Sequence, residues 1–335
     1  EAAKKIRKVL DDFQPDVVHV NNFNFQLTPS ILYAIRKYEK QTGRTVRIVY
    51  TAHDSQLVCP NHLMQRPSGE LCQECLGQKQ WNCTKHKCIH NSRVKSLLGS
   101  VEAKIYQHNH AYRMFDTVIC PSHFLEEVLK TNPDLDGKTV TMHNFLNRQE
   151  IPETEKKKYV LYFGRYSEEK RQDVLIEAVK RSAHSHRIQL ILAGQGPKER
   201  SLRWQGRSLR YPPIMGFFDT ERLCELMAMS DLYVHAADVE IEAIACLEAV
   251  ASGLVPVIAD SPLSATSQFA LDHRSLFEAG NVDDLAERID WWYEHATARH
   301  QMARVYAESA NQYRLKNSIR KAEQMFAKKI AEPLG

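Results

Sequence analysis

The feature that most constrains the fold is a regular alternation of short β-branched runs with longer segments of helical periodicity. Short apolar runs of this kind, bounded by polar turns, are typical of buried strands. They occur at residues 15–20, 46–52, 116–122, 159–163, 187–193, 231–237 and 254–260. Strands that alternate with helices predict a parallel sheet covered on both faces. We therefore predict an α/β fold that is built from two doubly wound domains.

A hinge is predicted over residues 143–158, where the strand patterns lapse and charged residues become frequent. It separates a first domain, residues 1–150, from a second domain, residues 157–312. Residues 313–335 continue an amphipathic helical pattern, and we expect this segment to cross back to the first domain. The first domain offers only about three strands, fewer than an average sheet, and the chain opens on a helical pattern. We therefore expect the first domain to be incomplete.

Composition excludes several classes of protein. The 335 residues are 43% apolar, which is enough for two cores and argues against disorder. No run of 18 or more apolar residues occurs, and the opening EAAKKIRKVLDDF lacks the apolar centre of a signal peptide. We expect a cytoplasmic protein, located in the cytosol or at the inner face of the cell membrane.

The net charge is +4, and the positive excess lies in the first half of the chain. Residues 1–150 contain 20 Lys and Arg against 15 Asp and Glu, whereas the remaining residues contain 25 against 26. Such an excess suits an anionic partner, whether a phosphate, a membrane surface or a nucleic acid. A solvated basic face explains it equally well.

Five of the eight cysteines lie in one stretch, and we interpret residues 59–91 as an irregular insertion in the first domain. A C-x2-C pair and a C-x4-C pair are formed by Cys72, Cys75, Cys83 and Cys88. These spacings are compatible with a structural zinc ion at these four cysteines, although the second pair is wider than usual, and unligated thiols explain the cluster at least as well. Four protein ligands would leave no open position on the metal, so it would not be catalytic.

A second segment of the first domain has an amphipathic helical pattern. Its apolar residues recur at helical spacing at Val94, Leu97, Leu98, Val101 and Ile105. This spacing is typical of a helix face buried in a core, which we predict here. The flanking lysines leave peripheral contact with a membrane surface as the alternative.

Glycines and cations follow two strands of the second domain. Gly164, Arg165 and Lys170 follow the run at 159–163, and Gly194 and Gly196 follow the next run. Ligands of open parallel sheets bind at the carboxyl ends of strands. A guanidinium and an ammonium five residues apart can together neutralise a diphosphate without a metal ion, and glycines allow a close approach of the backbone.

Two glutamates interrupt the apolar segment 236–262. Glu240 comes just before an expected helix, and Glu248 lies about two turns inside it, between Ile244 and Ser252 on the helix surface. A carboxylate in apolar surroundings is costly unless it meets solvent, a partner or a ligand. A ribose diol would satisfy Glu248, and sugar hydroxyls or a developing positive centre would satisfy Glu240. We predict that both glutamates bind a sugar nucleotide.

Together, the sequences FGRYSEEK, GQGP and E-x7-E followed by ASGLVPVI resemble the donor half of retaining family 4 glycosyltransferases. That family has the GT-B fold of two Rossmann-like domains. The resemblance implies that Arg165 and Lys170 contact the donor diphosphate, that Glu240 lies by the transferred sugar, and that Glu248 binds the ribose. It also implies a set of residues around the nucleotide sugar, namely Gly164, Gly194, Gly196 and Ile244. The family commonly has Phe-Gly after its first acidic pair, whereas this chain reads EIEAI at 240–244, and Glu242 adds a charge near the anionic donor.

The resemblance extends less tightly over the first half. VRIVYTAHDS and DTVICPSHFLEEVL are similar to two strand ends of the family's first domain. His53 would then stand at the carboxyl end of a strand with a catalytic role near the acceptor, and Ser122 at the next strand reads as a helix N-cap. His19 and Asn21 occupy another such end.

These observations predict a retaining hexosyltransferase that uses a UDP or GDP sugar and a glycan or lipid-linked acceptor, of glycolipid or polysaccharide type. We expect no catalytic metal and no nucleic-acid partner. A sugar-nucleotide epimerase or hydrolase on the same fold is one alternative, and a zinc-stabilised nucleic-acid-binding protein is another. A pseudoenzyme or fragment that binds the donor without transferring the sugar is a third.

Overall fold

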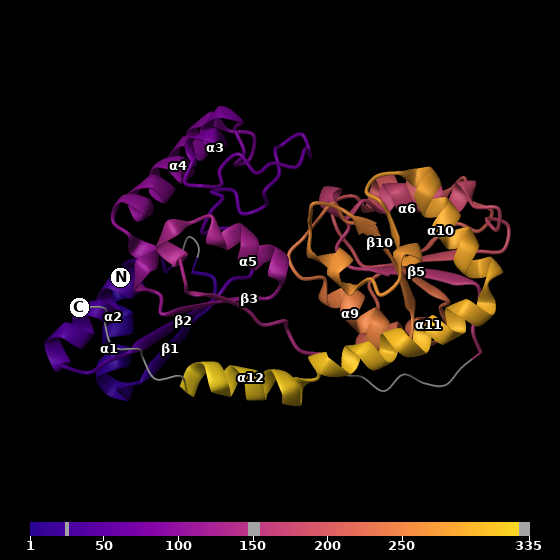
Figure 1. The fold of residues 1–335 in the computed structure, drawn as a ribbon. Helices are drawn as coiled ribbons and strands as arrows, with labels where there is room; N and C mark the ends of the chain where they lie inside the picture. The colour runs from indigo at the N-terminus through magenta and orange to yellow at the C-terminus, as the bar shows by residue number, and fades with distance from the viewer. Residues whose placement is uncertain (24–26, 147–154, 328–335) are drawn as a thin grey trace. The chain divides into compact units, whose positions relative to one another are not determined.

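The computed structural model describes residues 1–23, 27–146 and 155–327, and it divides into two compact units (Figure 1). Unit 1 comprises residues 1–143 and 318–335, and unit 2 comprises residues 144–317. The division falls inside the segment in which the sequence predicts a hinge. Residues 147–154 of that segment, and the terminal residues 328–335, lie outside the described part of the chain.

Unit 1 contains a parallel four-stranded sheet in the order β1-β2-β3-β4. Its strands are β1 (Val17–Val20), β2 (Arg47–Thr51), β3 (Thr117–Cys120) and β4 (Thr139–Thr141). Every residue of β2 and β3 is buried, as expected of a parallel sheet covered on both faces. The sequence predicted only about three strands here, because β4 is a half-buried tripeptide without an apolar run.

The helices of unit 1 precede, connect and follow these strands. They are α1 (Ala2–Phe13), α2 (Ser30–Thr42), α3 (Trp81–Lys85), α4 (Arg93–His108), α5 (His123–Lys130) and most of α12 (Leu315–Ala327), with 3-10 turns η1 (Ala111–Met114) and η2 (Pro133–Leu135). Ser122 is the N-cap of α5, as the sequence predicted, and its Oγ accepts a hydrogen bond of 3.2 Å from the Leu125 N–H. Phe326 of α12 lies against His19 of β1, with 5.5 Å between ring centroids.

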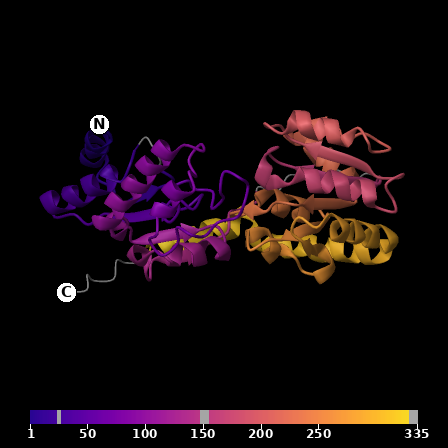
Figure 2. The same cartoon turned by 90° about the horizontal axis from the view of Figure 1, so that it is seen from above.

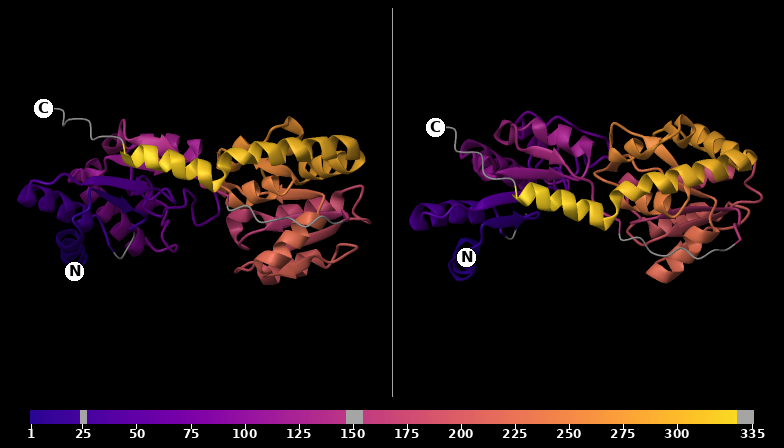
Figure 3. Two further views of the ribbon diagram at one scale, coloured as in Figure 1. Left: turned by 90° about the horizontal axis from the view of Figure 1, so that it is seen from below. Right: turned by 60° about the horizontal axis from the view of Figure 1, so that its bottom comes forward.

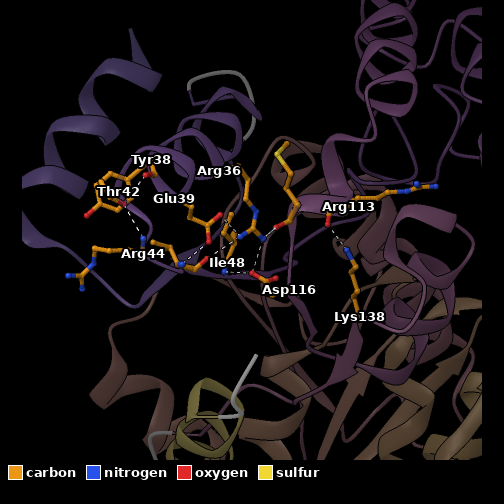
Figure 4. A network of polar contacts seen from close by, with 11 residues as sticks. Arg36, Tyr38, Glu39, Thr42, Arg44, Ile48, Arg113, Asp116 and Lys138 are labelled. Atoms are coloured by element: carbon orange, nitrogen blue, oxygen red, sulfur yellow. Dashed lines mark hydrogen bonds and ion pairs between the residues drawn. The ribbon is translucent and has the colours of Figure 1, made fainter. Parts of the chain in front are cut away.

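A network of polar contacts joins α2 to the sheet of unit 1 (Figure 4). The Arg36 guanidinium donates to Glu39 and to Asp116, at 2.9 Å each. Asp116 also accepts a hydrogen bond of 2.7 Å from the Ile48 N–H of β2. Burial works against the charge of Arg36, but the two carboxylates outweigh it and raise the pKa of the guanidinium. The network therefore fixes how α2 packs on the ends of β2 and β3.

Helix α4 contradicts the prediction of a buried apolar face. Its buried residues are Ser96 and Ser100, whereas all five of its predicted core residues are exposed. The apolar spacing correctly predicted a helix but not the side that packs. Small serines allow α4 to approach its neighbour α3 closely, so the polar side of this helix faces inward.

Unit 2 contains a parallel six-stranded sheet in the order β12-β10-β8-β5-β6-β7. Its strands are β5 (Tyr159–Phe163), β6 (Gln189–Ala193), β7 (Ile214–Gly216), β8 (Leu232–His235), β10 (Val255–Asp260) and β12 (Leu276–Glu278). A separate parallel pair is formed by β9 (Val239–Glu240) and β11 (Leu263–Ser264). The predicted α/β architecture of parallel sheets covered by helices is confirmed.

Helices cover both faces of the six-stranded sheet. They are α6 (Gln172–Arg181), α7 (Glu199–Gly206), α8 (Thr220–Met229), α9 (Ile244–Ala251), α10 (Val282–Glu294) and α11 (Ala296–Ser309), with 3-10 turns η3 (Glu168–Lys170), η4 (Ala265–Phe269), η5 (His273–Ser275) and η6 (Ala310–Tyr313). Helix α10 packs with α6 on one face and α11 packs with α9 on the other (Figure 1). Figure 2 and Figure 3 show the same elements from above and from below.

Two glycines bring the loops after β5 and β6 into direct contact. A Cβ atom on Gly194 would lie 1.9 Å from the Gly164 carbonyl oxygen, and one on Gly196 would lie 2.3 Å from the Tyr166 carbonyl oxygen. The Tyr166 N–H in turn donates to the Gln195 carbonyl at 3.0 Å. No side chain fits at either glycine, because backbone atoms occupy that space.

We predict that Gly194→Ala lowers the free energy of unfolding by about 3 kcal/mol or more, because the methyl group must displace backbone. Gly43→Ala is the matched control, since Gly43 also has a positive φ (+70°) but no atom within 4 Å of its Cβ position. The control should lose only about 1 kcal/mol from backbone strain. Chemical denaturation of both variants measures the difference, and equal losses would contradict the close approach.

Candidate functional site

The strand order of unit 2 marks where a ligand is expected. Counted along the chain, the main strands have the order 3-2-1-4-5-6, read from β7 to β12, and this order reverses between β5 and β8. In open parallel sheets, ligands bind outside the carboxyl ends of the strands at such a reversal. The loops that leave β5 and β8 contain Arg165, Lys170 and Glu240.

Lys170 and Glu240 form an ion pair between these two loops. Their side chains are only 20% and 18% exposed. His235 at the end of β8 is buried, and its Nε2 lies 3.3 Å from Glu240 Oε2. Burial works to raise the pKa of Glu240, but His235 and Lys170 outweigh it and lower that pKa to about 2. Glu240 is therefore an anion that holds the Lys170 ammonium in place.

A second ion pair joins the same two loops, and the sequence analysis did not identify it. Arg171 donates to Asp238 at 2.7 Å, and the Asp238 N–H donates to the Glu169 carbonyl at 2.9 Å. Arg171 has a left-handed backbone (φ 50°), which turns the chain from η3 into α6. The only sequence signal for this pair is weak: Arg171 directly follows Lys170, and Asp238 lies two residues before Glu240.

A cavity of about 720 Å³ opens at the carboxyl ends of β5 and β6. It is lined by Arg165 and by three of the predicted glycines, Gly164, Gly194 and Gly196, and by two aromatic residues of the loop after β7, Phe217 and Phe218. The Arg165 side chain is exposed, and its backbone carbonyl accepts hydrogen bonds from Tyr162 at 3.0 Å and Gln172 at 2.8 Å. The loop is therefore fixed by its backbone while the guanidinium remains accessible.

Glu248 and Ile244 lie on the outer surface of α9, where both are exposed. Although Glu248 is open to solvent, partial burial of its carboxyl raises the pKa. Within residues 1–23, 27–146 and 155–327, no hydrogen-bond or ion-pair partner of this carboxylate is found. The structure thus joins Lys170 to Glu240 and places Arg165 at the cavity, but it pairs neither cation with Glu248.

Comparisons with known proteins identify the family of the chain. The model for "Glycosyl transferases group 1" matches residues 144–309, and the model for "Glycosyltransferase Family 4" matches residues 1–150. The chain belongs to the family 4 glycosyltransferases of GT-B fold. The two matches together extend from residue 1 to residue 309, which includes every site residue that the sequence predicted.

Solved structures of proteins from Rickettsia africae and Anabaena share the fold. A glycosyltransferase from Rickettsia africae has a TM-score of 0.66 and 16% identity, over 97% of this chain and 79% of that one. Anabaena Alr3699/HepE has a TM-score of 0.68 and 17% identity, over 96% and 81%. The catalytic domain of cholesterol-α-glucosyltransferase from Helicobacter pylori is 50% identical over 46% of this chain and 98% of that one, with a TM-score of 0.45. The comparison with curated proteins finds no match.

Glu242 of this glycosyltransferase is 8% exposed and is bound to Asn144 at the start of unit 2. The Asn144 N–H donates to Glu242 Oε1 at 2.7 Å, and the Asn144 side chain donates to the other carboxylate oxygen. Burial is the main cause that raises the pKa of Glu242 to about 7, and the hydrogen bonds oppose it only in part. The residue that departs from the family pattern thus joins the loop before α9 to the segment that enters unit 2.

His53, the residue predicted near the acceptor, lies in unit 1 just after β2. Its side chain is exposed, its Nε2 lies 2.9 Å from Asn21 Oδ1, and its N–H donates to Asn22 Oδ1 at 3.2 Å. Burial, and to a lesser extent the nearby His53, lower the pKa of His19. Polar residues from two strand ends therefore meet here, and the catalytic role of His53 stays a prediction.

The predicted zinc site is not supported. Among the described residues, no group of three or more His, Cys, Asp or Glu side chains is arranged to hold a metal ion. The thiols form contacts in pairs instead: Cys59, which lay outside the predicted ligand set, with Cys75, and Cys83 with Cys88. All eight cysteines are free thiols. The spacing of the cysteines could not show that Cys59 contacts Cys75, which is one of the four predicted zinc ligands.

The raised pKa of Glu242 predicts a pH-dependent stability. Since this pKa is about 7 in the folded chain against an ordinary 4.5, the protonated form favours folding, and this stabilisation is lost as the pH rises from about 4.5 through 7. Glu242→Gln cannot titrate, so its free energy of unfolding should rise relative to that of the unsubstituted protein by about 3 kcal/mol over this range.

Denaturation at several pH values measures the difference, with the exposed Glu287→Gln as the control. A gap between Glu242→Gln and the unsubstituted protein that stays constant with pH would contradict the assignment.

Proposed function

We propose that this glycosyltransferase transfers a hexose from a UDP or GDP sugar to a hydroxyl of a glycan or lipid-linked acceptor, with retention at the anomeric carbon. The observation that carries the proposal is the cavity lined by Arg165 and three glycines, because Arg165 lies in the same loop as Lys170, which forms an ion pair with Glu240. Its volume of about 720 Å³ suits a nucleotide sugar. Anabaena Alr3699/HepE, which shares the fold, has been solved in complex with UDP, and with UDP and glucose.

The two cations are suited to a diphosphate that gains charge as it leaves. The Arg165 guanidinium is accessible at the cavity, and the Lys170 ammonium is held by an anionic Glu240. Charges that are positioned before the reaction stabilise the transition state without reorganisation. Arg165 and Lys170 would bind the diphosphate, and Glu240 would orient Lys170 and contact the sugar.

In the proposed transfer, the bond between the anomeric carbon and the leaving phosphate oxygen breaks. The acceptor oxygen forms its new bond to the same face of the sugar, and the acceptor proton passes to an oxygen of the leaving diphosphate. No protein side chain then has to act as the base. His53 in unit 1 would position the acceptor, and Glu248 would hold the ribose hydroxyls.

We expect Lys170→Ala to lower turnover about 100-fold, because one preorganised charge on the diphosphate is lost. Glu248→Ala should instead weaken binding of the nucleoside diphosphate about tenfold, since the ribose loses a charge-assisted acceptor. The exposed Arg207→Ala, in the same unit, is the control for both. Calorimetry with UDP and GDP, together with turnover measurements, tests the roles, and unchanged affinity in Glu248→Ala would reject the ribose assignment.

The stereochemistry of the product tests the reaction class. We predict that an α-linked donor gives an α-linked product, which proton NMR of the anomeric signal reports. A β-linked product would contradict retention. Consumption of the donor at the same rate with and without acceptor would instead indicate a hydrolase or an epimerase.

A further inference from the structure

Helix α4 of unit 1 presents a continuous apolar surface to solvent. Val94, Leu98 and Ile105 are 68%, 64% and 51% exposed, and Leu97 and Val101 are exposed as well. At 100° per residue these five side chains fall within an arc of about 100°. We name these five residues the α4 stripe. An arrangement of this kind on one helix is more than the scattered exposure of single apolar residues.

The opposite side of α4 is fixed by polar contacts, so the stripe cannot turn inward. Ser100 Oγ donates to the Gln80 carbonyl at 2.9 Å, and Thr84 of α3 donates to Ser100 Oγ at 2.8 Å. The Ile89 N–H donates to Ser96 Oγ at 2.9 Å. Both serines are fully buried. Figure 1 shows α3 and α4 side by side in unit 1.

The chain around the stripe is strongly basic. Residues 79–110 contain six Lys and Arg but a single acidic residue, Glu102. The rest of residues 1–150 then contains fourteen of each sign, so this segment accounts for the whole positive excess of the first half. Arg93 and Lys95 lie on the two flanks of the α4 stripe, and Trp81 of the adjoining α3 is 51% exposed.

We propose that the α4 stripe, with Trp81 and the flanking cations, docks on the surface of a lipid bilayer that contains anionic lipids. Apolar residues between flanking Lys and Arg are typical of helices that lie in the membrane interface, where tryptophan is also enriched. The 16 residues of α4 span about 24 Å, which is less than the hydrocarbon core of a bilayer. No helix among the described residues is long and apolar enough to cross a membrane. The helix therefore lies on the bilayer.

The positive charge around the α4 stripe favours a lipid surface over a second copy of the chain or a nucleic acid as the partner of this stripe. A second copy would bring two basic segments together, and like charges oppose that association. A nucleic acid would match the cations but would leave the apolar stripe in water. Anionic headgroups above an acyl layer match both features at once.

The test is flotation of the full chain with vesicles, which does not depend on transfer activity. We expect strong binding to vesicles of equal parts phosphatidylcholine and phosphatidylglycerol, weaker binding at high salt, and at least about tenfold weaker binding to phosphatidylcholine alone. Failure of the unsubstituted protein to float with the anionic vesicles would overturn the proposal. A failed glycosyltransfer assay would leave this result unaffected, so the two proposals are separable.

Matched variants identify the surface that binds. Leu98→Asn should weaken binding about tenfold, whereas Val305→Asn, a comparably exposed change on α11, should not. Trp81→Ser should weaken binding and the exposed Trp204→Ser should leave it unchanged. Circular dichroism verifies that each variant is folded, as expected for exposed positions. Equal flotation of Leu98→Asn and Val305→Asn would overturn the proposal.

Two further experiments change the flanking charges and measure the oligomeric state by sedimentation. Arg93→Gln with Lys95→Gln should weaken binding to anionic vesicles, and Arg207→Gln with Arg210→Gln is the control. A lipid-free dimer that becomes a monomer in Leu98→Asn would assign the stripe to a second copy and overturn the assignment to lipid.

Discussion

The ion pair between Lys170 and Glu240 is the interaction on which the candidate site depends. Glu240 is 18% exposed and lies beside the buried His235, a setting in which an unpaired carboxylate would be costly. Lys170 compensates this charge, and the compensation joins the loop after β5 to the loop after β8. Arg171 and Asp238 repeat the connection beside it. Because these loops flank the reversal of strand order, the cations that hold them together lie where open parallel sheets bind their ligands.

The two units use polar contacts in different ways. In unit 2, the Arg165 guanidinium after β5 is accessible beside a cavity. In unit 1, Arg36, Glu39 and Asp116 fix α2 to the sheet, and buried serines fix α4 to α3. The packing of α4 on α3 through its serines also determines which side of α4 faces solvent. Because the polar side of α4 is the side that packs, its apolar side is exposed to solvent.

Periodicity predicted the parallel α/β architecture of both sheets, because buried strands need uninterrupted apolar runs. It missed β4, β7 and β12, which are only three residues long each, and the short pair β9 and β11. It was wrong about α4, since spacing reports that a helix has two sides but not which one packs. Chain spacing alone also placed zinc on four cysteines, although a contact with Cys59 occupies one of them.

The sequence also predicted part of the candidate site, because the apolar runs show where the strands end. Strand ends of a parallel sheet meet at one edge, so Arg165, Lys170 and Glu240 could be assigned to one region from the sequence. The contacts of His235, Arg171 and Asn144 depend on side-chain geometry that no local pattern encodes. Glu242 illustrates the limit: in sequence it is one more charge near an anionic ligand, whereas in the structure it is a buried carboxyl bound to the start of unit 2.

A crystal structure of the chain with UDP, or with GDP if only that nucleotide binds, tests the central claim most directly. We predict that the diphosphate lies at the carboxyl ends of β5 and β8, within hydrogen-bond distance of the Arg165 guanidinium and the Lys170 ammonium. A nucleotide bound elsewhere, with the Lys170–Glu240 pair unchanged and Arg165 free of the phosphates, would contradict the account.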